Sequence, residues 1–144
     1  MYQRILFPTD GSDISIKALH HAVSLARLCG ASLHVLSVKE PFPFSAISEM
    51  NPTLPQDFFD QQERVAMARV KAAIDTASAA GVPCSGHTLE ASHAWQGILE
   101  QAKAQDCELI VMASHGRRGI GALLLGSETQ KVLTHGNVPV LVVR

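Results

Sequence analysis

The sequence predicts an α/β domain in which four helices flank a five-stranded parallel sheet. Short apolar or β-branched runs alternate along the chain with longer amphipathic runs, which is the pattern of repeated βα units. Glycine and proline separate these runs. A chain of 144 residues has the size of one domain and buries enough surface to fold without a metal or a disulfide. We therefore expect a single domain over residues 1–144.

The first βα unit is the clearest. The run "RILFP" predicts a strand that ends at Pro8, and the following turn offers Ser12 or Asp13 as the N-cap of a helix. Apolar residues recur at helical spacing over residues 14–28. Gly30 stands where a C-cap glycine belongs, so the helix is expected to end just before it.

A long connection follows the second strand. "SLHVLSV", residues 32–38, predicts that strand. Residues 39–56, "KEPFPFSAISEMNPTLPQ", contain four prolines and predict an irregular excursion over the surface. Residues 57–80 then have the apolar spacing of a long helix.

The second half of the chain repeats the alternation. Its most apolar run, "ELIVMA", fits a strand at the centre of a sheet that is covered on both faces, whereas "CSGHTLE" has the weakest strand propensity. The expected elements are strands at 84–90, 108–113 and 138–143 and helices at 94–105 and 127–135.

Composition excludes several classes of partner. The chain is 47% hydrophobic and 17% charged with a net charge of -1, so nothing draws it toward nucleic acid or an anionic membrane. The N-terminus has no apolar signal region, and no apolar run approaches the roughly 20 residues of a membrane span. We expect a cytoplasmic protein.

Cysteine and histidine give no sign of a metal or redox centre. Cys29, Cys84 and Cys107 are isolated, which fits packing roles in a reducing compartment. The seven histidines form no HxxxH or HExxH pattern, so no metal site is expected.

The stretch "ASHGRRGIGALLLGSE", residues 113–128, is the candidate ligand loop. It follows "ELIVMA", and ligands of open parallel sheets sit beyond the carboxyl ends of the strands. Gly116 permits a sharp bend and close approach of a ligand. Gly126 and Ser127 open the last helix, whose N–H groups and dipole attract an anion. These features suit a phosphate, and a tight βα connection is the alternative reading of the same residues.

Three stretches resemble the universal stress protein family over nearly the full chain. They are "ILFPTDGSDISIKALHHAVSLA", "SLHVLSV" and "ELIVMASHGRRGIGALLLGSETQKVLTHGNVPVLVV". In nucleotide-binding members the loop runs Gly, two residues, Gly, nine residues, Gly and then Ser or Thr. Here Ala113 stands at the first glycine, Gly116 at the second, and Gly126 with Ser127 closes the pattern. The resemblance implies binding of ATP, with AMP or another adenine nucleotide as alternatives, and Ala113 is the departure.

The resemblance also implies a role for individual residues. The backbone of Gly116, Gly126 and Ser127, with the Ser127 hydroxyl, would hold the phosphates. Asp10 would meet ribose hydroxyls or a phosphate-bound Mg²⁺, although an aspartate in this position also suits a turn. The main chain of Val35 would pair with the adenine edge.

Four further residues complete the expected site. Pro8 and Thr9 would shape the pocket wall by the same resemblance. His115 either contacts a phosphate or fills the turn, and Arg117 either pairs with a terminal phosphate or points into solvent.

The family resemblance implies an architecture and an assembly. The implied fold is a doubly wound sheet with strand order 3-2-1-4-5, of the flavodoxin-like or adenine nucleotide alpha hydrolase-like type. The last strand, within residues 138–143, would lie at an edge of the sheet and pair with its copy in a homodimer.

No catalytic set is visible, because Ser127 lacks a GxSxG context and no carboxylates are paired by spacing. The family resemblance implies a stress-linked regulatory or signalling module with an unnamed protein partner, and the missing catalytic set argues against an enzyme. Two alternatives stay open: a dimeric interaction module that binds no ATP, and a weak ATPase.

Overall fold

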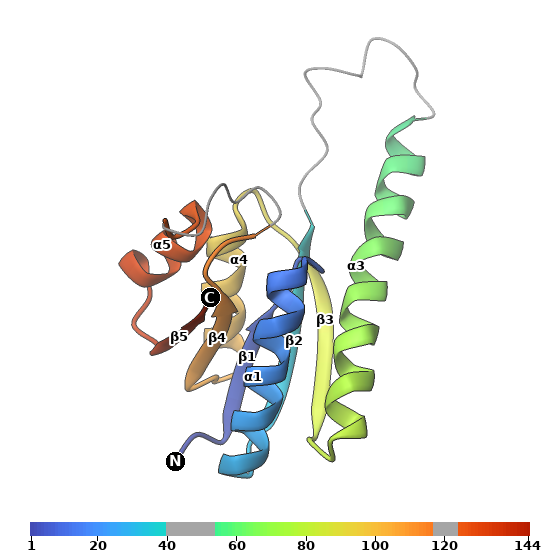
Figure 1. The fold of residues 1–144 in the computed structure, drawn as a ribbon. Coiled ribbons are helices and arrows are strands. Elements are labelled where there is room, and N and C mark those ends of the chain that lie inside the picture. Colours follow the sequence, from blue (N-terminus) through green and yellow to red (C-terminus); the bar gives the residue numbers. More distant parts are fainter. Residues whose placement is uncertain (40–53, 117–123) are drawn as a thin grey trace.

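The computed structural model describes residues 1–39, 54–116 and 124–144 of the chain; for residues 54 and 55 it describes the backbone only. Helices and strands alternate throughout (Figure 1). In chain order the elements are β1 (Arg4–Pro8), α1 (Asp13–Cys29), β2 (Ser32–Lys39), α3 (Leu54–Ala79), β3 (Cys84–Glu90), α4 (Ala94–Ala104), β4 (Leu109–Ala113), α5 (Ser127–His135) and β5 (Val140–Val143).

The five strands form one parallel sheet in the order β3-β2-β1-β4-β5, which confirms the predicted doubly wound fold. Helices α1 and α3 supply the core on one face, and α4 and α5 supply it on the other. The order reverses between β1 and β4, so the loops that follow these two strands leave the same edge of the sheet in neighbouring positions (Figure 1).

The central strands are buried on both faces. Ile5, Leu6 and Phe7 of β1 are 0% exposed, and Leu109–Met112 of β4 is likewise buried. Strands covered on both sides need continuous apolar runs, which is why "ELIVMA" was readable as a central strand. Ile5 and Phe7 join the core under α1 and α3, whereas Leu6 joins the core under α4 and α5.

Helix α1 begins and ends at the residues that the sequence indicated. The Ser12 side chain accepts a hydrogen bond from the Ser15 N–H at 3.3 Å, as an N-cap does. Gly30 has a φ of 68°, in the left-handed region that glycine adopts without strain. Both caps are therefore confirmed, with Ser12 rather than Asp13 at the N-cap.

Two boundaries differ from the prediction by more than one residue. Helix α3 begins at Leu54, so the last residues of the expected excursion, 54–56, are helical. Pro55 did not prevent this, because a helix tolerates proline in its first turn, where the missing N–H has no intrahelical acceptor. Strand β5 begins at Val140 rather than at residue 138, directly after Pro139.

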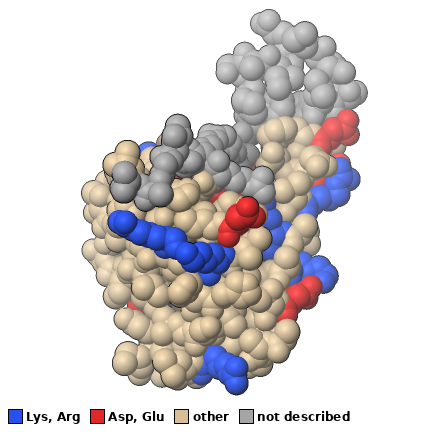
Figure 2. All heavy atoms as spheres, in the orientation of Figure 1, with Lys and Arg blue, Asp and Glu red and all other residues tan. Residues whose placement is uncertain are grey.

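No large area of one charge sign marks the visible face of the molecule. Figure 2 shows lysine and arginine lying beside aspartate and glutamate, separated by uncharged surface. Among the helices that the structure describes, none is both long and apolar enough to cross a membrane.

A histidine pair lies between the sheet and α4. The rings of His34 in β2 and His87 in β3 meet edge to face, with centroids 4.6 Å apart. His34 Nδ1 lies 2.9 Å from Ser85 Oγ, and its Nε2 lies 3.5 Å from the side-chain nitrogen of the buried Gln101. Burial, and in second place repulsion by His87, lowers the pKa of His34 below its usual 6.5.

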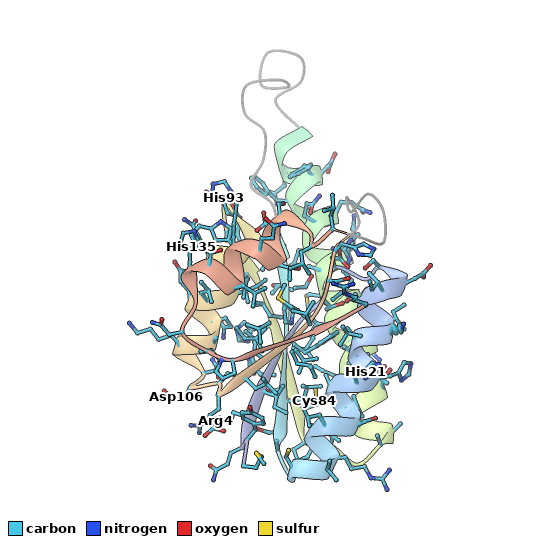
Figure 3. All side chains as sticks on the ribbon, turned by 60° about the vertical axis from the view of Figure 1, so that its left-hand side comes forward. Arg4, His21, Cys84, His93, Asp106 and His135 are labelled. Carbon is cyan, nitrogen blue, oxygen red and sulfur yellow. The ribbon has the colours of Figure 1, made fainter. Side chains whose placement is uncertain are left out.

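This lowered pKa predicts a loss of stability in acid. Because the unfolded chain binds a proton at His34 more readily than the folded chain, the free energy of unfolding should fall as the pH drops through about 6.5. Urea denaturation between pH 8 and pH 5 measures the effect. His34→Gln should flatten this part of the profile, whereas His21→Gln, on the exposed side of α1 (Figure 3), should not. Equal slopes for all three proteins would contradict the assignment.

Candidate functional site

The loops after β1 and β4 meet at the carboxyl edge of the sheet. Asp10 follows β1, and its Oδ1 accepts a hydrogen bond from the Ser12 N–H at 2.9 Å. A Cβ atom on Gly116 would lie only 2.6 Å from Asp10 Oδ2. The carboxylate therefore rests against the backbone of the β4 loop, and glycine at position 116 is what permits this approach.

Residues 8 and 9 hold the β1 loop in place. Pro8 is the last residue of β1, in register with Leu36 of β2, and the Thr9 N–H donates to the Leu36 carbonyl at 2.8 Å. The Thr9 hydroxyl lies 2.8 Å from Ser15 Oγ and accepts from the Gly11 N–H at 3.2 Å. Thr9 thus uses its side chain to fix the turn that presents Asp10.

The two ends of the β4 loop are fastened to each other. The Gly126 N–H donates to the Ser114 carbonyl at 2.7 Å, and the Ser114 N–H donates to the Val143 carbonyl at 2.7 Å. A Cβ atom on Gly126 would lie 3.0 Å from His115 Cα. The N–H of Gly126 is therefore already used within the protein, and a side chain at this position would press on the backbone of His115.

Helix α5 begins directly at this closure. Its N-cap, Gly126, has no side chain, and the first intrahelical bond runs from the Gln130 N–H to the Gly126 carbonyl at 3.0 Å. The N–H groups of Ser127 and Glu128 precede that bond and have no intrahelical acceptor. Ser127 is exposed, so its hydroxyl and the positive end of the helix dipole can meet an anion.

The arrangement so far is a parallel sheet whose β1 and β4 loops meet at its switch point, with a helix start that suits an anion. The model of the universal stress protein family matches residues 1–144. The chain belongs to this family.

Known universal stress proteins resemble this one over its whole length. Universal stress protein MJ0531 of Methanocaldococcus jannaschii is 32% identical over 100% of this chain and 83% of its own. The solved structure of the hypothetical protein MJ0577, from the same organism, has a TM-score of 0.87 at 25% identity and covers 99% of this chain and 96% of its own. A universal stress protein solved in complex with cAMP has a TM-score of 0.74 at 25% identity, with coverage of 99% and 97%.

The alanine in the universal stress protein loop fits without strain. Ala113 is the last residue of β4, and among the described residues other than glycine only Asp106 has a positive φ. The Ala113 methyl group packs against the core under α1 and α3, and its carbonyl accepts from the Thr129 hydroxyl at 3.0 Å. The position therefore does not require the backbone freedom of glycine.

Of the remaining predicted residues, only His115 lies at the two loops in the part of the chain that the structure describes. His115 contacts Ser114 Oγ through Nδ1 at 3.2 Å, and its Cα and Cβ lie against Gly126, whereas its contact with a phosphate stays a prediction. Val35 is fully buried inside β2, in register with Phe7 and Gly86, and the structure does not bring it to the two loops. Its pairing with adenine stays a prediction, and Arg117 lies outside the described residues.

Sequence reasoning missed the groups that hold the loop together. Ser114 and Thr129 are 5% and 2% exposed and fasten the loop to β5 and β4. A serine or threonine beside a glycine motif is too common to signal such a role. In the part of the chain that the structure describes, no three histidine, cysteine or acidic side chains are grouped as ligands for a metal ion.

The contact between Asp10 and Gly116 predicts a measurable coupling. Gly116→Ala should lower the free energy of unfolding by about 1 kcal/mol, because the new methyl group displaces the carboxylate. In an Asp10→Ala background the same substitution should be neutral or stabilising, since alanine restricts the unfolded chain. A double-mutant cycle from urea denaturation measures the difference. Additive effects would show that the two residues do not touch in solution.

Proposed function

We propose that this universal stress protein binds an adenine nucleotide at the carboxyl edge of the sheet, with its phosphates against Gly116 and the start of α5. The observation that best supports the proposal is that the Asp10 carboxylate lies against Gly116, in the same loop whose other end opens α5 at Ser127. The neighbouring structure with bound cAMP supports an adenine nucleotide as the ligand class.

ATP with Mg²⁺ is the ligand we propose first, with AMP or another adenine nucleotide as alternatives. The Ser127 and Glu128 N–H groups and the Ser127 hydroxyl are donors for phosphate oxygens. A carboxylate beside phosphates favours a divalent cation between them, so Asp10 would share the Mg²⁺ or bind the ribose hydroxyls.

We propose that occupancy of the site, rather than turnover, carries the signal to a protein partner. Ser114 Oγ contacts the His115 imidazole, yet Ser114 is only 5% exposed and is shielded from a ligand. A weak ATPase is the alternative. Phosphate release above the buffer rate, lost in Asp10→Ala, would favour it.

The C-terminal strand is the proposed dimer contact. Strand β5 lies at the end of the sheet and pairs with β4 on one side. Leu141 is 41% exposed there, and an apolar edge strand tends to find a partner strand. Pairing with a second copy across a two-fold axis would satisfy both the backbone and the leucine.

Calorimetric titration tests the nucleotide proposal. Wild-type protein should bind ATP with Mg²⁺, and Gly126→Val should lose at least about tenfold in affinity, because its side chain presses on the His115 backbone and displaces the start of α5. Ala104→Val, at the exposed end of α4, is the matched control for added bulk. A folded wild type that binds neither ATP, AMP nor cAMP at millimolar concentration would overturn the proposal in favour of an interaction module.

Light scattering at micromolar protein tests the assembly. We expect a dimer for the wild type and a monomer for Leu141→Lys, because the charge would be buried in the paired strands. Leu28→Lys, at an 84% exposed position near the end of α1, should stay dimeric. A monomeric wild type would rule out this role of β5.

A further inference from the structure

The first turn of α4 receives its cap from another helix. The N-cap residue of α4, His93, makes no side-chain cap hydrogen bond, and the first turn of α4 contains no acidic residue. Instead, the Trp95 N–H donates to Glu128 Oε2 of α5 at 2.8 Å. A carboxylate from α5 thus satisfies an N–H group that α4 cannot satisfy itself.

Glu128 also stands in the first turn of α5, directly after Ser127. A carboxylate there commonly turns toward the N–H groups of its own helix, where it would compete with a phosphate. The bond to Trp95 holds this carboxylate on α4. The hydrogen bond to Trp95 therefore directs this carboxylate to α4 rather than to the N–H groups of its own helix.

The other end of α5 is fixed to α4 as well. The Trp95 indole stacks on the imidazole of His135, the last residue of α5, with centroids 4.6 Å apart and planes 25° apart. A Cβ on Gly136 would lie 2.7 Å from Leu99 Cδ2, so α4 approaches this end closely. Figure 3 shows His93 and His135 on the same side of the molecule. One residue of α4, Trp95, thus contacts both ends of the helix that begins at the anion site.

We propose that Glu128 is a positioning residue for the phosphate site. The hydrogen bond from Trp95 to Glu128 positions the start of α5 against α4 and keeps the Glu128 carboxylate away from the phosphate site. A phosphate bound at Ser127 should therefore change the environment of Trp95. The proposal rests on the nucleotide-binding function proposed above. It adds a side chain that positions the start of α5 for an anionic group without itself touching the ligand.

Two substitutions separate positioning from simple charge. Glu128→Gln removes the charge and keeps an oxygen that can accept from Trp95, whereas Glu128→Ala removes both. If Glu128 acts by position, the glutamine variant should bind ATP and AMP as the wild type does, and the alanine variant should lose about fivefold to tenfold in affinity, the effect of a lost helix cap. Glu100→Ala, an exposed carboxylate on α4, is the matched control.

Fluorescence supplies a readout that a purely structural role would not change. Trp95 is the only tryptophan, so its emission reports on this contact alone. ATP or AMP should shift the emission of the wild type and of Glu128→Gln, and should leave that of Glu128→Ala unchanged. Circular dichroism and thermal unfolding establish that each variant is folded before it is titrated.

The outcomes distinguish this proposal from the function on which it rests. Absence of nucleotide binding by the wild type overturns both. Tighter binding by both Glu128 variants would show that Glu128 acts as a repelling charge, and unchanged binding in both would show that it has no role. A wild type that binds nucleotide with no change in Trp95 emission would leave the function intact and overturn the coupling.

Discussion

The hydrogen bond from the Gly126 N–H to the Ser114 carbonyl is the contact on which the site depends. At 2.7 Å it closes the β4 loop at its base, and it places the first residue of α5 beside the last residue of β4. The bond from the Thr129 hydroxyl to the Ala113 carbonyl fixes the next turn of the helix to the same strand end. These bonds are internal to the protein, so the start of α5 is in position before any ligand arrives, which reduces the ordering that binding requires.

The sheet separates two hydrophobic cores, and its carboxyl edge is where elements of both faces meet. Asp10 leads into α1, which covers one face, while Ser127 begins α5, which covers the other. A molecule held between them touches both layers at once. At the same edge the Trp95 N–H of α4 donates a hydrogen bond to Glu128 of α5, so α4 is also linked to the start of α5.

The sequence predicted those parts of the fold that depend on neighbours along the chain. Ser12 and Gly30 mark the ends of α1 because caps are local, and "ELIVMA" identified a buried strand because both of its faces are covered. The site was predictable only as a set of loops. The reason for Gly116 lies in Asp10, and Trp95 meets Glu128 across 33 residues of sequence, so neither pairing has a local signal. A local signal can also mislead. Pro55 suggested an irregular segment, yet α3 begins at Leu54, because the first turn of a helix accepts proline.

The alanine at the end of β4 bears on how such loops are recognised and how they vary. Residue 113 is extended, its methyl group packs on the core, and its contribution to the loop is made by a carbonyl that every amino acid possesses. Glycine there would give the unfolded chain additional conformations, worth about 0.4–1 kcal/mol, without adding a contact to the folded one. The first glycine of the family pattern is therefore interchangeable with alanine in this backbone. A motif search that demands glycine at that position would reject this chain for a methyl group that its folded backbone accommodates.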